Sequence, residues 1–159
     1  EPNTKRGSEN LNFLNSYISE NVTVTGENAI TINIDSDKIP DGKKKVSEND
    51  FKTSDMILSM DVALDLDKSN ANKSDIENFA RKLETLCATF KETKKHKGFY
   101  WEYYVPYFIE MSDKKHIETF AYIAHASSEK QETQDWLKNH GKEIQDFFQW
   151  SKGFQWNKN

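Results

Sequence analysis

The amino-acid sequence predicts a single α+β domain, in which a small antiparallel sheet from the N-terminal half packs on a helix-rich, aromatic C-terminal half. Three observations lead to this fold class. Apolar and polar residues alternate in two early segments, as in half-buried strands. Apolar residues recur at helical spacing between 76 and 90. Fifteen of the twenty aromatic residues lie between Phe99 and Trp156, so we expect the core there.

Composition limits the class of protein further. The chain has 159 residues, a net charge of −4 and 35% hydrophobic residues, and none of its stretches approaches the 18 apolar residues of a membrane span. Aromatic residues make up 13% of it, too many for a disordered chain. We therefore expect one domain over 1–159, with a polar tether at 1–8 and an exposed loop at 35–54. The sequence does not decide the compartment: export to the periplasm or cell surface and a cytoplasmic location are equally compatible with it.

The N-terminal segment predicts a helix followed by a hairpin. Ser8 is expected to cap a helix that runs to Glu20. After it, apolar residues alternate with polar ones on both sides of a turn at 26–28, which is typical of two antiparallel strands. The alternating residues are Val22, Val24, Ile30, Ile32 and Ile34.

A third strand is expected over 56–66. Its even-numbered positions are all apolar, whereas Asp61 and Asp65 fall on odd positions. A strand would place these carboxylates on one solvated face, and a helix would scatter them around its circumference. A helix remains the alternative.

The clearest predicted element is a helix that starts at Ser74. Ser74 and Glu77 form the S-x-x-E capping box, in which each side chain satisfies a free backbone N–H group. Lysines between 91 and 97 suit the C-terminal end of the helix dipole, and Gly98 is a natural stop. The apolar stripe consists of Ile76, Phe79, Ala80, Leu83, Cys87 and Phe90.

The following segment, 99–127, permits two interpretations. Alternation from Phe99 to Ile109 is typical of a strand. Pro106, however, would remove a hydrogen bond from a central strand, whereas the first turn of a helix tolerates it. We therefore expect two helices, Tyr104–Met111 and Lys114–Ala126.

The last predicted element is one long helix. Ser128 and Gln131 match a second capping box. The apolar residues from Trp136 to Phe148 keep one helical phase across Gly141, which favours an uninterrupted helix.

The stretch Tyr104–Phe148 resembles a tetratricopeptide-type helical hairpin. The turn Glu110–Lys115 and the segment Ile117–Ala121 that follows it carry the resemblance. It implies an alternative, mainly α, fold in which two helices pack antiparallel to each other.

Residue types that often carry chemistry form no complete motif. Cys87 lies on the apolar stripe and is expected in the core, as the usual place of a free cysteine. The oxygen-rich segment from Asp65 to Ile76 lacks the glycine and glutamate of an EF-hand loop. No two histidines are one helical turn apart, as zinc hydrolases need, and we expect surface positions with His140 partly packed. The histidines are His96, His116, His125 and His140. No metal or cofactor is predicted.

Nucleic acid is a disfavoured partner. The lysine-rich segment 91–97 followed by Phe99 and Trp101 combines positive charge with stacking surfaces. The chain as a whole is acidic, with a pI of about 5.6, and shows no nucleic-acid-binding motif.

Aromatic residues between 99 and 110, with two carboxylates, form the candidate site. These residues are Trp101, Tyr103, Tyr104, Tyr107, Glu102 and Glu110. Because no catalytic motif is present and aromatic residues commonly anchor interfaces, we expect a non-catalytic binding or scaffolding module for a protein or peptide. The alternative is a carbohydrate- or small-ligand-binding protein, or a weak hydrolase. Three of the four rings around a pocket beside a carboxylate would favour the ligand, and an exposed patch would favour the protein partner.

Overall fold

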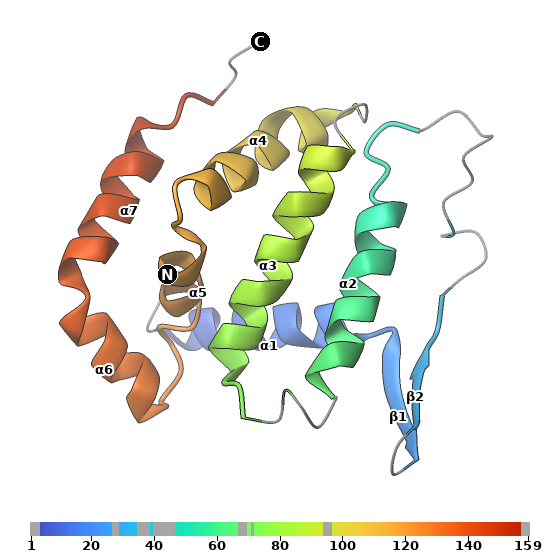
Figure 1. The fold of residues 1–159 in the computed structure, drawn as a ribbon. Coiled ribbons are helices and arrows are strands. Elements are labelled where there is room, and N and C mark those ends of the chain that lie inside the picture. The colour runs from blue at the N-terminus through green and yellow to red at the C-terminus, as the bar shows by residue number, and fades with distance from the viewer. Residues whose placement is uncertain are drawn as a thin grey trace.

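The computed structural model describes residues 4–26, 29–34, 39, 47–66, 70, 72–93 and 97–156. Within these residues the chain forms seven helices and one two-stranded sheet, which confirms an α+β fold dominated by helices. In chain order the elements are α1 (Lys5–Ser19), β1 (Val22–Gly26), β2 (Ala29–Ile32), α2 (Lys52–Asp65), α3 (Asp75–Glu92), α4 (Phe99–Asp113), α5 (Ile117–Ala124), α6 (Gln131–Asn139) and α7 (Gly141–Gly153) (Figure 1).

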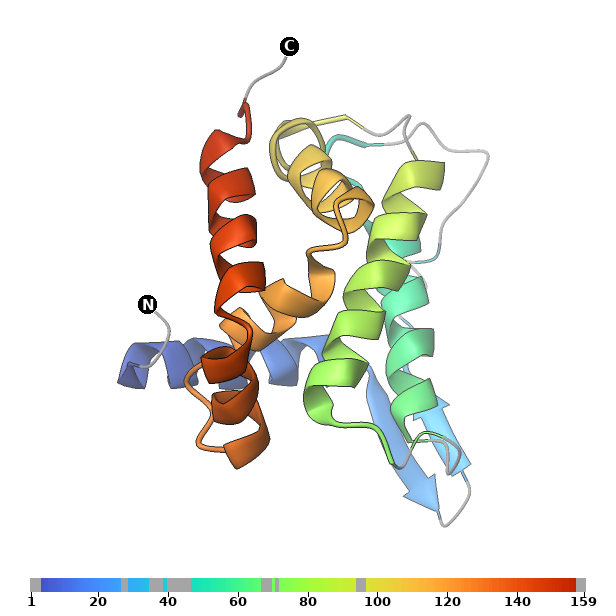
Figure 2. The same ribbon diagram turned by 60° about the vertical axis from the view of Figure 1, so that its left-hand side comes forward.

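Helix α3 is the central element of the molecule. It packs on α2, α4 and α5, and α5 is in turn contacted by α6 and α7. Helix α4 lies near the C-terminal end of α3, whereas α1 runs across the molecule closer to the N-terminal end of α3 (Figures 1 and 2). The two ends of α3 are therefore bordered by different elements.

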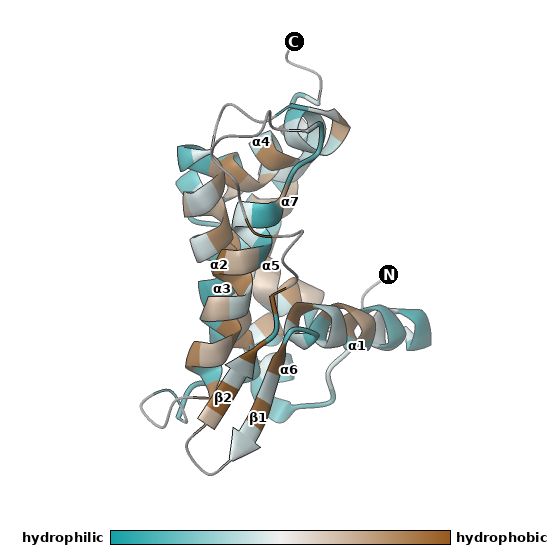
Figure 3. Ribbon diagram, turned by 90° about the vertical axis from the view of Figure 1, so that its right-hand side faces the viewer, coloured by the Kyte–Doolittle hydropathy of each residue, from teal (hydrophilic) through white to brown (hydrophobic). Residues whose placement is uncertain are grey.

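The predicted hairpin is confirmed. Strands β1 and β2 pair antiparallel, with Val22 opposite Ile32 and Val24 opposite Ile30. Hydrophobic and hydrophilic residues alternate along both strands (Figure 3). The sheet packs mainly on α2, a helix of the N-terminal half, and not on the C-terminal helices as expected. Two residues of the predicted turn, 27 and 28, lie outside the described residues.

The predicted third strand is wrong, because 52–65 forms helix α2. In this helix the alternating aliphatic residues do not share a face: Met60 and Leu64 are exposed, whereas Val62 is buried. Asp61 is buried as well. Asp61 and Asp65 are one helical turn apart, and both form ion pairs with Arg81 of α3. The carboxylates therefore face a basic partner, and this pairing could not be read from the alternation.

Helix α1 begins earlier than the sequence suggested. Thr4 is the N-cap, and its Oγ1 accepts a hydrogen bond from the backbone N–H of Gly7 at 3.0 Å. The predicted cap, Ser8, instead lies inside the helix, so part of the segment 1–8 is helical. Residues 1–3 lie outside the described residues.

Helix α3 confirms its predicted capping box. The backbone N–H of Glu77 donates to Ser74 Oγ at 3.2 Å, and the N–H of Ser74 donates to Glu77 Oε2 at 2.7 Å. The helix ends at Glu92, before the predicted stop at Gly98. Residues 94–96 of the lysine-rich segment lie outside the described part of the chain.

Helix α4 starts at Phe99, five residues before the predicted start, because Asn49 caps it from a distance. Asn49 Oδ1 accepts a hydrogen bond from the N–H of Tyr100 at 2.9 Å, and the Asn49 N–H donates to Lys97 O at 2.7 Å. Gly98 has a φ of +113°, and a Cβ atom there would lie 2.7 Å from the Asn49 nitrogen. The start of α4 thus depends on a residue far away in sequence and on a glycine that permits close approach.

Segment 47–54, the end of the predicted exposed loop 35–54, is therefore partly structural. Asn49 caps α4, Phe51 is half-buried and residues 52–54 belong to α2. Residues 35–38 and 40–46 lie outside the described residues.

The prediction of two helices between 99 and 127 is confirmed, with two corrections. Pro106 lies inside α4 and not in its first turn; it is exposed, so the missing N–H group falls on the solvent side of the helix. Helix α5 begins at Ile117 and ends at Ala124, and is shorter than expected. Helices α4 and α5 both pack on α3 instead of along each other, so they do not form the antiparallel hairpin that the tetratricopeptide resemblance implies.

The predicted long C-terminal helix is wrong, because the chain breaks at His140 between α6 and α7. The carbonyl of Trp136 accepts hydrogen bonds from the backbone N–H of His140 at 3.0 Å and from its Nδ1 at 2.8 Å. The expected second capping box is also not formed. Helix α6 starts at Gln131 after Lys130, and Gln131 Nε2 donates to Asp135 instead.

The core consists of two adjoining clusters. One contains Ile76, Phe79, Ala121 and Tyr122, and the other contains Cys87, Met111, Ile117 and Phe147. Ala80, Leu83 and Phe120 pack against both. Among the described residues, none of the helices combines the length and apolar character that crossing a membrane requires.

Candidate functional sites at the two ends of helix α3

Trp101, the first of the predicted site residues, belongs to the packed interior. It is 6% exposed, and its ring stacks on Phe51 at 4.7 Å and meets Phe90 edge-on at 5.4 Å. Its indole N–H donates to the backbone oxygen of Asp50 at 2.9 Å. Trp101 therefore joins α4 to the segment before α2 and is not available as a surface contact.

Tyr107 and Glu110 join α4 to α7. Tyr107 is half-buried, and its ring stacks on Trp150 at 4.9 Å. Its hydroxyl lies 2.8 Å from Ser151 Oγ. Glu110 Oε1 accepts a hydrogen bond from the indole N–H of Trp150 at 3.0 Å. Both residues thus have structural contacts that hold the C-terminal helix in place.

Tyr104 is exposed and Tyr103 is half-buried, and both belong to a group of five aromatic residues that we call the aromatic patch. The patch consists of Phe99, Tyr100, Tyr103, Tyr104 and Trp156. Its rings are in continuous contact, with centroids 4.8–6.2 Å apart. Phe99, Tyr100, Tyr104 and Trp156 are 58%, 53%, 41% and 38% exposed. Glu102 is exposed in the first turn of α4 and receives a hydrogen bond from the N–H of Gly98 at 3.4 Å.

An apolar pocket of about 250 Å³ opens beside the patch, between α3 and α4. Of the four predicted rings, only Tyr104 lines it, and none of the described carboxylates does. The lining residues are Phe51, Leu83, Leu86, Cys87, Phe90, Tyr100, Tyr104, Val105 and Phe108. The arrangement that would favour a carbohydrate site, with three of the rings around a pocket beside a carboxylate, is not the one observed.

Cys87 lines the apolar pocket and is 1% exposed, as predicted for a core residue. Its thiol lies 3.3 Å from the backbone oxygen of Phe108. Burial raises the pKa of the thiol to about 11, so the unreactive protonated form prevails near neutral pH.

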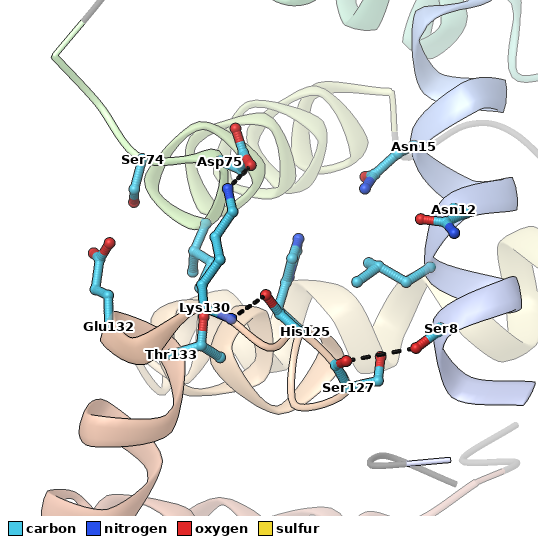
Figure 4. A pocket seen from close by; sticks show the side chains of 13 residues that line it. Ser8, Asn12, Asn15, Ser74, Asp75, His125, Ser127, Lys130, Glu132 and Thr133 are labelled. Carbon is cyan, nitrogen blue, oxygen red and sulfur yellow. Dashed lines mark hydrogen bonds and ion pairs between the residues drawn. The ribbon is translucent and has the colours of Figure 1, made fainter. Parts of the chain in front are cut away.

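A second, polar pocket of about 270 Å³ lies at the other end of α3, where α1 and the segment between α5 and α6 meet it (Figure 4). This pocket could not be predicted from the sequence. Its residues come from three distant parts of the chain, and most are single serine, threonine or asparagine residues that form no motif. The polar lining residues are Ser8, Asn12, Asn15, Ser74, Asp75, His125, Ser127, Ser128, Lys130, Glu132 and Thr133.

His125 lines the polar pocket and is buried, in contrast to the surface position expected of it. It is 5% exposed, and its ring meets Phe79 edge-on at 5.0 Å. Nδ1 lies 2.8 Å from the carbonyl oxygen of Ala121, one helical turn earlier. Burial lowers the pKa of His125, so the neutral imidazole is favoured. Ile117, Ala121 and His125 follow one another at helical spacing, and this was the sequence signal that could have predicted the burial of His125.

One wall of the polar pocket is an ion pair between two helix N-termini. Lys130 Nζ pairs with the carboxylate of Asp75, the first residue of α3 (Figure 4). The hydrogen bond from Lys130 lowers the pKa of Asp75. Nearby, Thr133 is fully buried, and its Oγ1 has no hydrogen-bond partner among the described residues.

A buried charge cluster joins α2 and α3 between the two pockets. Arg81 pairs with Asp61 and Asp65, and Lys82 also pairs with Asp65. Burial lowers the pKa of Arg81. Because these charges neutralise one another and hold two core helices together, we assign them a structural role.

The described residues contain no group of three or more histidine, cysteine, aspartate or glutamate side chains placed to hold a metal ion. The oxygen-rich segment after Asp65 is only partly described, since 67–69 and 71 lie outside the described ranges.

Comparison of the chain with protein-family models, with curated proteins and with solved structures found no match in any of the three.

Proposed function

We propose that this protein is a non-catalytic binding module that engages a protein or peptide partner through the aromatic patch. The observation that carries the proposal is the cluster of exposed aromatic rings at the start of α4, four of which are more than a third exposed. Large aromatic side chains bury much area at a low entropic cost, and they are enriched among the residues that dominate binding energy. Exposed apolar surface of this kind is typical of interaction sites.

The apolar pocket supports a partner that inserts a side chain. Tyr100 and Tyr104 belong to both the patch and the pocket, so one ligand could cover the rings and fill the cavity. The pocket is lined by aliphatic and aromatic side chains and Cys87, which suits a leucine, methionine or phenylalanine side chain. We therefore propose an extended or helical peptide segment with one large apolar anchor.

A carbohydrate is the second candidate from the sequence, and the geometry favours it less. Sugar hydroxyls need polar partners, and none of the described carboxylates lines the pocket beside Tyr104. Glu110, one of the two predicted carboxylates, already accepts a hydrogen bond from Trp150.

The test is selection from a displayed library of random peptides against the intact chain. We expect enriched peptides to share a large apolar residue, and Tyr104→Ala and Tyr100→Ala to weaken their binding by about tenfold or more. Tyr17→Ala is the matched control, because Tyr17 is an aromatic residue 60% exposed on α1, outside the patch. Its binding constant should not change.

Two results would overturn the proposal. One is enrichment of peptides whose binding is insensitive to Tyr100 and Tyr104. The other is failure to enrich any peptide while soluble monosaccharides perturb the patch tyrosines in NMR spectra, which would establish the carbohydrate alternative.

A further inference from the structure

We infer that the polar pocket at the N-terminal end of α3 is a second binding site, which takes a small uncharged polyhydroxy molecule such as a monosaccharide or polyol. The ligand would donate a hydrogen bond to His125 and exchange further hydrogen bonds with the asparagines of α1. The site lies at the opposite end of α3 from the aromatic patch and does not depend on the peptide proposal.

The orientation of His125 leaves a hydrogen-bond acceptor facing the pocket. A carbonyl oxygen can only accept, so the contact between Nδ1 and Ala121 O places the proton on Nδ1 and leaves Nε2 as an acceptor. The imidazole makes its hydrogen bond through Nδ1, and the side chain as a whole is 5% exposed. Figure 4 shows the imidazole directed into the space between the Asp75–Lys130 pair and α1. Nε2 is not among the buried polar atoms that lack a partner, so it is an acceptor open to the pocket, to which a hydroxyl group can donate.

Thr133 contributes a buried hydroxyl group to the pocket. This side chain lines the same pocket and is 0% exposed, yet its hydroxyl has no partner within the described part of the chain. Buried polar groups without partners are costly, and a bound ligand is one way to satisfy them. Thr133 Oγ1 is thus a buried hydroxyl without a partner, and His125 Nε2 beside it is an acceptor open to the same pocket.

The walls of the pocket suit a polyol as well. Asn15 points from α1 toward the same space, and Asn12 lies next to it on α1 (Figure 4). Ser74 adds a hydroxyl group on the far side, beside Asp75, and Ser127 adds one next to Ser8 of α1. Amides and hydroxyls both donate and accept hydrogen bonds, as the hydroxyl groups of a polyol do. Leu11 and Ile76 add an apolar surface for the carbon skeleton of the ligand.

Charge and size narrow the ligand class. An anion would be repelled by Asp75 and Glu132. A cation would be repelled by Lys130, which already pairs with Asp75. An uncharged ligand avoids both repulsions. The volume of about 270 Å³ is just below the range of about 300–1,000 Å³ typical of drug-sized ligands, which suits a single sugar ring or a smaller polyol.

The experiment is an NMR titration of the intact chain with D-glucose, myo-inositol and glycerol, each followed through backbone amide shifts. We expect at least one of them to shift amides of α1, of the α3 N-terminus and of the segment 125–133. Asn15→Ala should weaken that binding by about tenfold, the consequence of losing one or two ligand hydrogen bonds. The matched control is Asn10→Ala, an exposed asparagine of α1 that does not line the pocket, and its affinity should equal that of the unmodified chain.

A second variant tests the role of the imidazole. His125→Phe removes the acceptor while keeping a ring beside Phe79, and it should abolish the shifts if the variant shows a folded spectrum. If it is unfolded, Asn12→Ala, from the exposed side of α1, replaces it with the same expectation. The proposal is overturned if none of the three polyols shifts these amides, if Asn15→Ala and Asn10→Ala bind alike, or if inorganic phosphate or ethylammonium binds there instead.

Discussion

The two ends of helix α3 differ in the kind of surface they offer. At the C-terminal end, Phe90 and Cys87 face rings of α4, and the neighbouring pocket is apolar. At the N-terminal end, Ser74 and Asp75 meet α1 and the segment before α6 around a polar pocket. The contrast teaches that one helix can border two pockets of opposite chemistry, because different elements pack against its two ends.

The buried charge cluster lies between these ends. Arg81 is held by two carboxylates of α2, so the middle of α3 is fixed to its neighbour by ion pairs as well as by packing. Each end is therefore built on a helix whose position is set independently of any ligand. At each end, variants of packed residues can therefore be compared with variants of exposed residues.

The largest effect is expected for Trp101→Ala at the aromatic end. Removing a ring that is packed between Phe51 and Phe90 should lower the free energy of unfolding by about 3–5 kcal/mol. Tyr100→Ala, one residue away but 53% exposed, should change it by no more than about 0.5 kcal/mol. Urea denaturation measures both. Similar losses for the two variants would contradict the division of this end into a packed core and a free patch.

A smaller effect is expected for Ser74→Ala at the polar end. Loss of the capping box should lower the free energy of unfolding by about 1 kcal/mol, because the N–H of Glu77 loses its partner. Ser128→Ala is the matched control, because Ser128 and Gln131 match the capping-box sequence but do not cap α6. Its change should be smaller when measured by the same denaturation. An equal or larger loss for Ser128 would show that the α6 start relies on it.

The smallest effect is a pH dependence at the polar end. Burial lowers the pKa of His125 in the folded protein, so as the pH falls below about 6.5 the unfolded chain binds a proton that the folded protein does not. Stability should therefore be complete above this pH and decrease below it. Asp75 and Lys130 are the charged groups that act on the ring, and their effects on its pKa oppose each other. Urea midpoints at pH 7.5 and 5.5 measure the decrease.

His125→Gln should reduce this decrease without removing it, because burial also lowers the pKa of His116. His116→Gln should remove the remaining part. An unchanged pH dependence in His125→Gln would show that the imidazole is as well solvated in the folded protein as in the unfolded chain.

Local signals in the sequence were sufficient where neighbours along the chain supply the partners. The Ser74–Glu77 capping box, the hairpin register of Val24 with Ile30 and the burial of Cys87 all follow from residues close in sequence or on one stripe. In each case the hydrogen bonds or the apolar face are set within one element or one turn, so periodicity and capping rules apply directly.

Local signals failed where the partner is distant. The aspartates of α2 face Arg81, the start of α4 is capped by Asn49, and the helix breaks at His140 although the apolar phase continues. For the first two, the partner belongs to another part of the chain. In the third, the two helices α6 and α7 keep one apolar phase across the break, so periodicity alone does not report it.

By itself, the sequence determined the fold class, the hairpin, the central helix and the concentration of aromatic residues after Phe99, because these depend on composition and on short-range periodicity. Only the tertiary structure decided which rings are exposed, that Trp101 is packed inside, and that His125 opens into a polar pocket with Asn15 and Thr133. The physical reason is that exposure and pocket walls are set by the packing of α1, α3, α4 and the segment between α5 and α6. Residues far apart in sequence become neighbours only when those elements assemble.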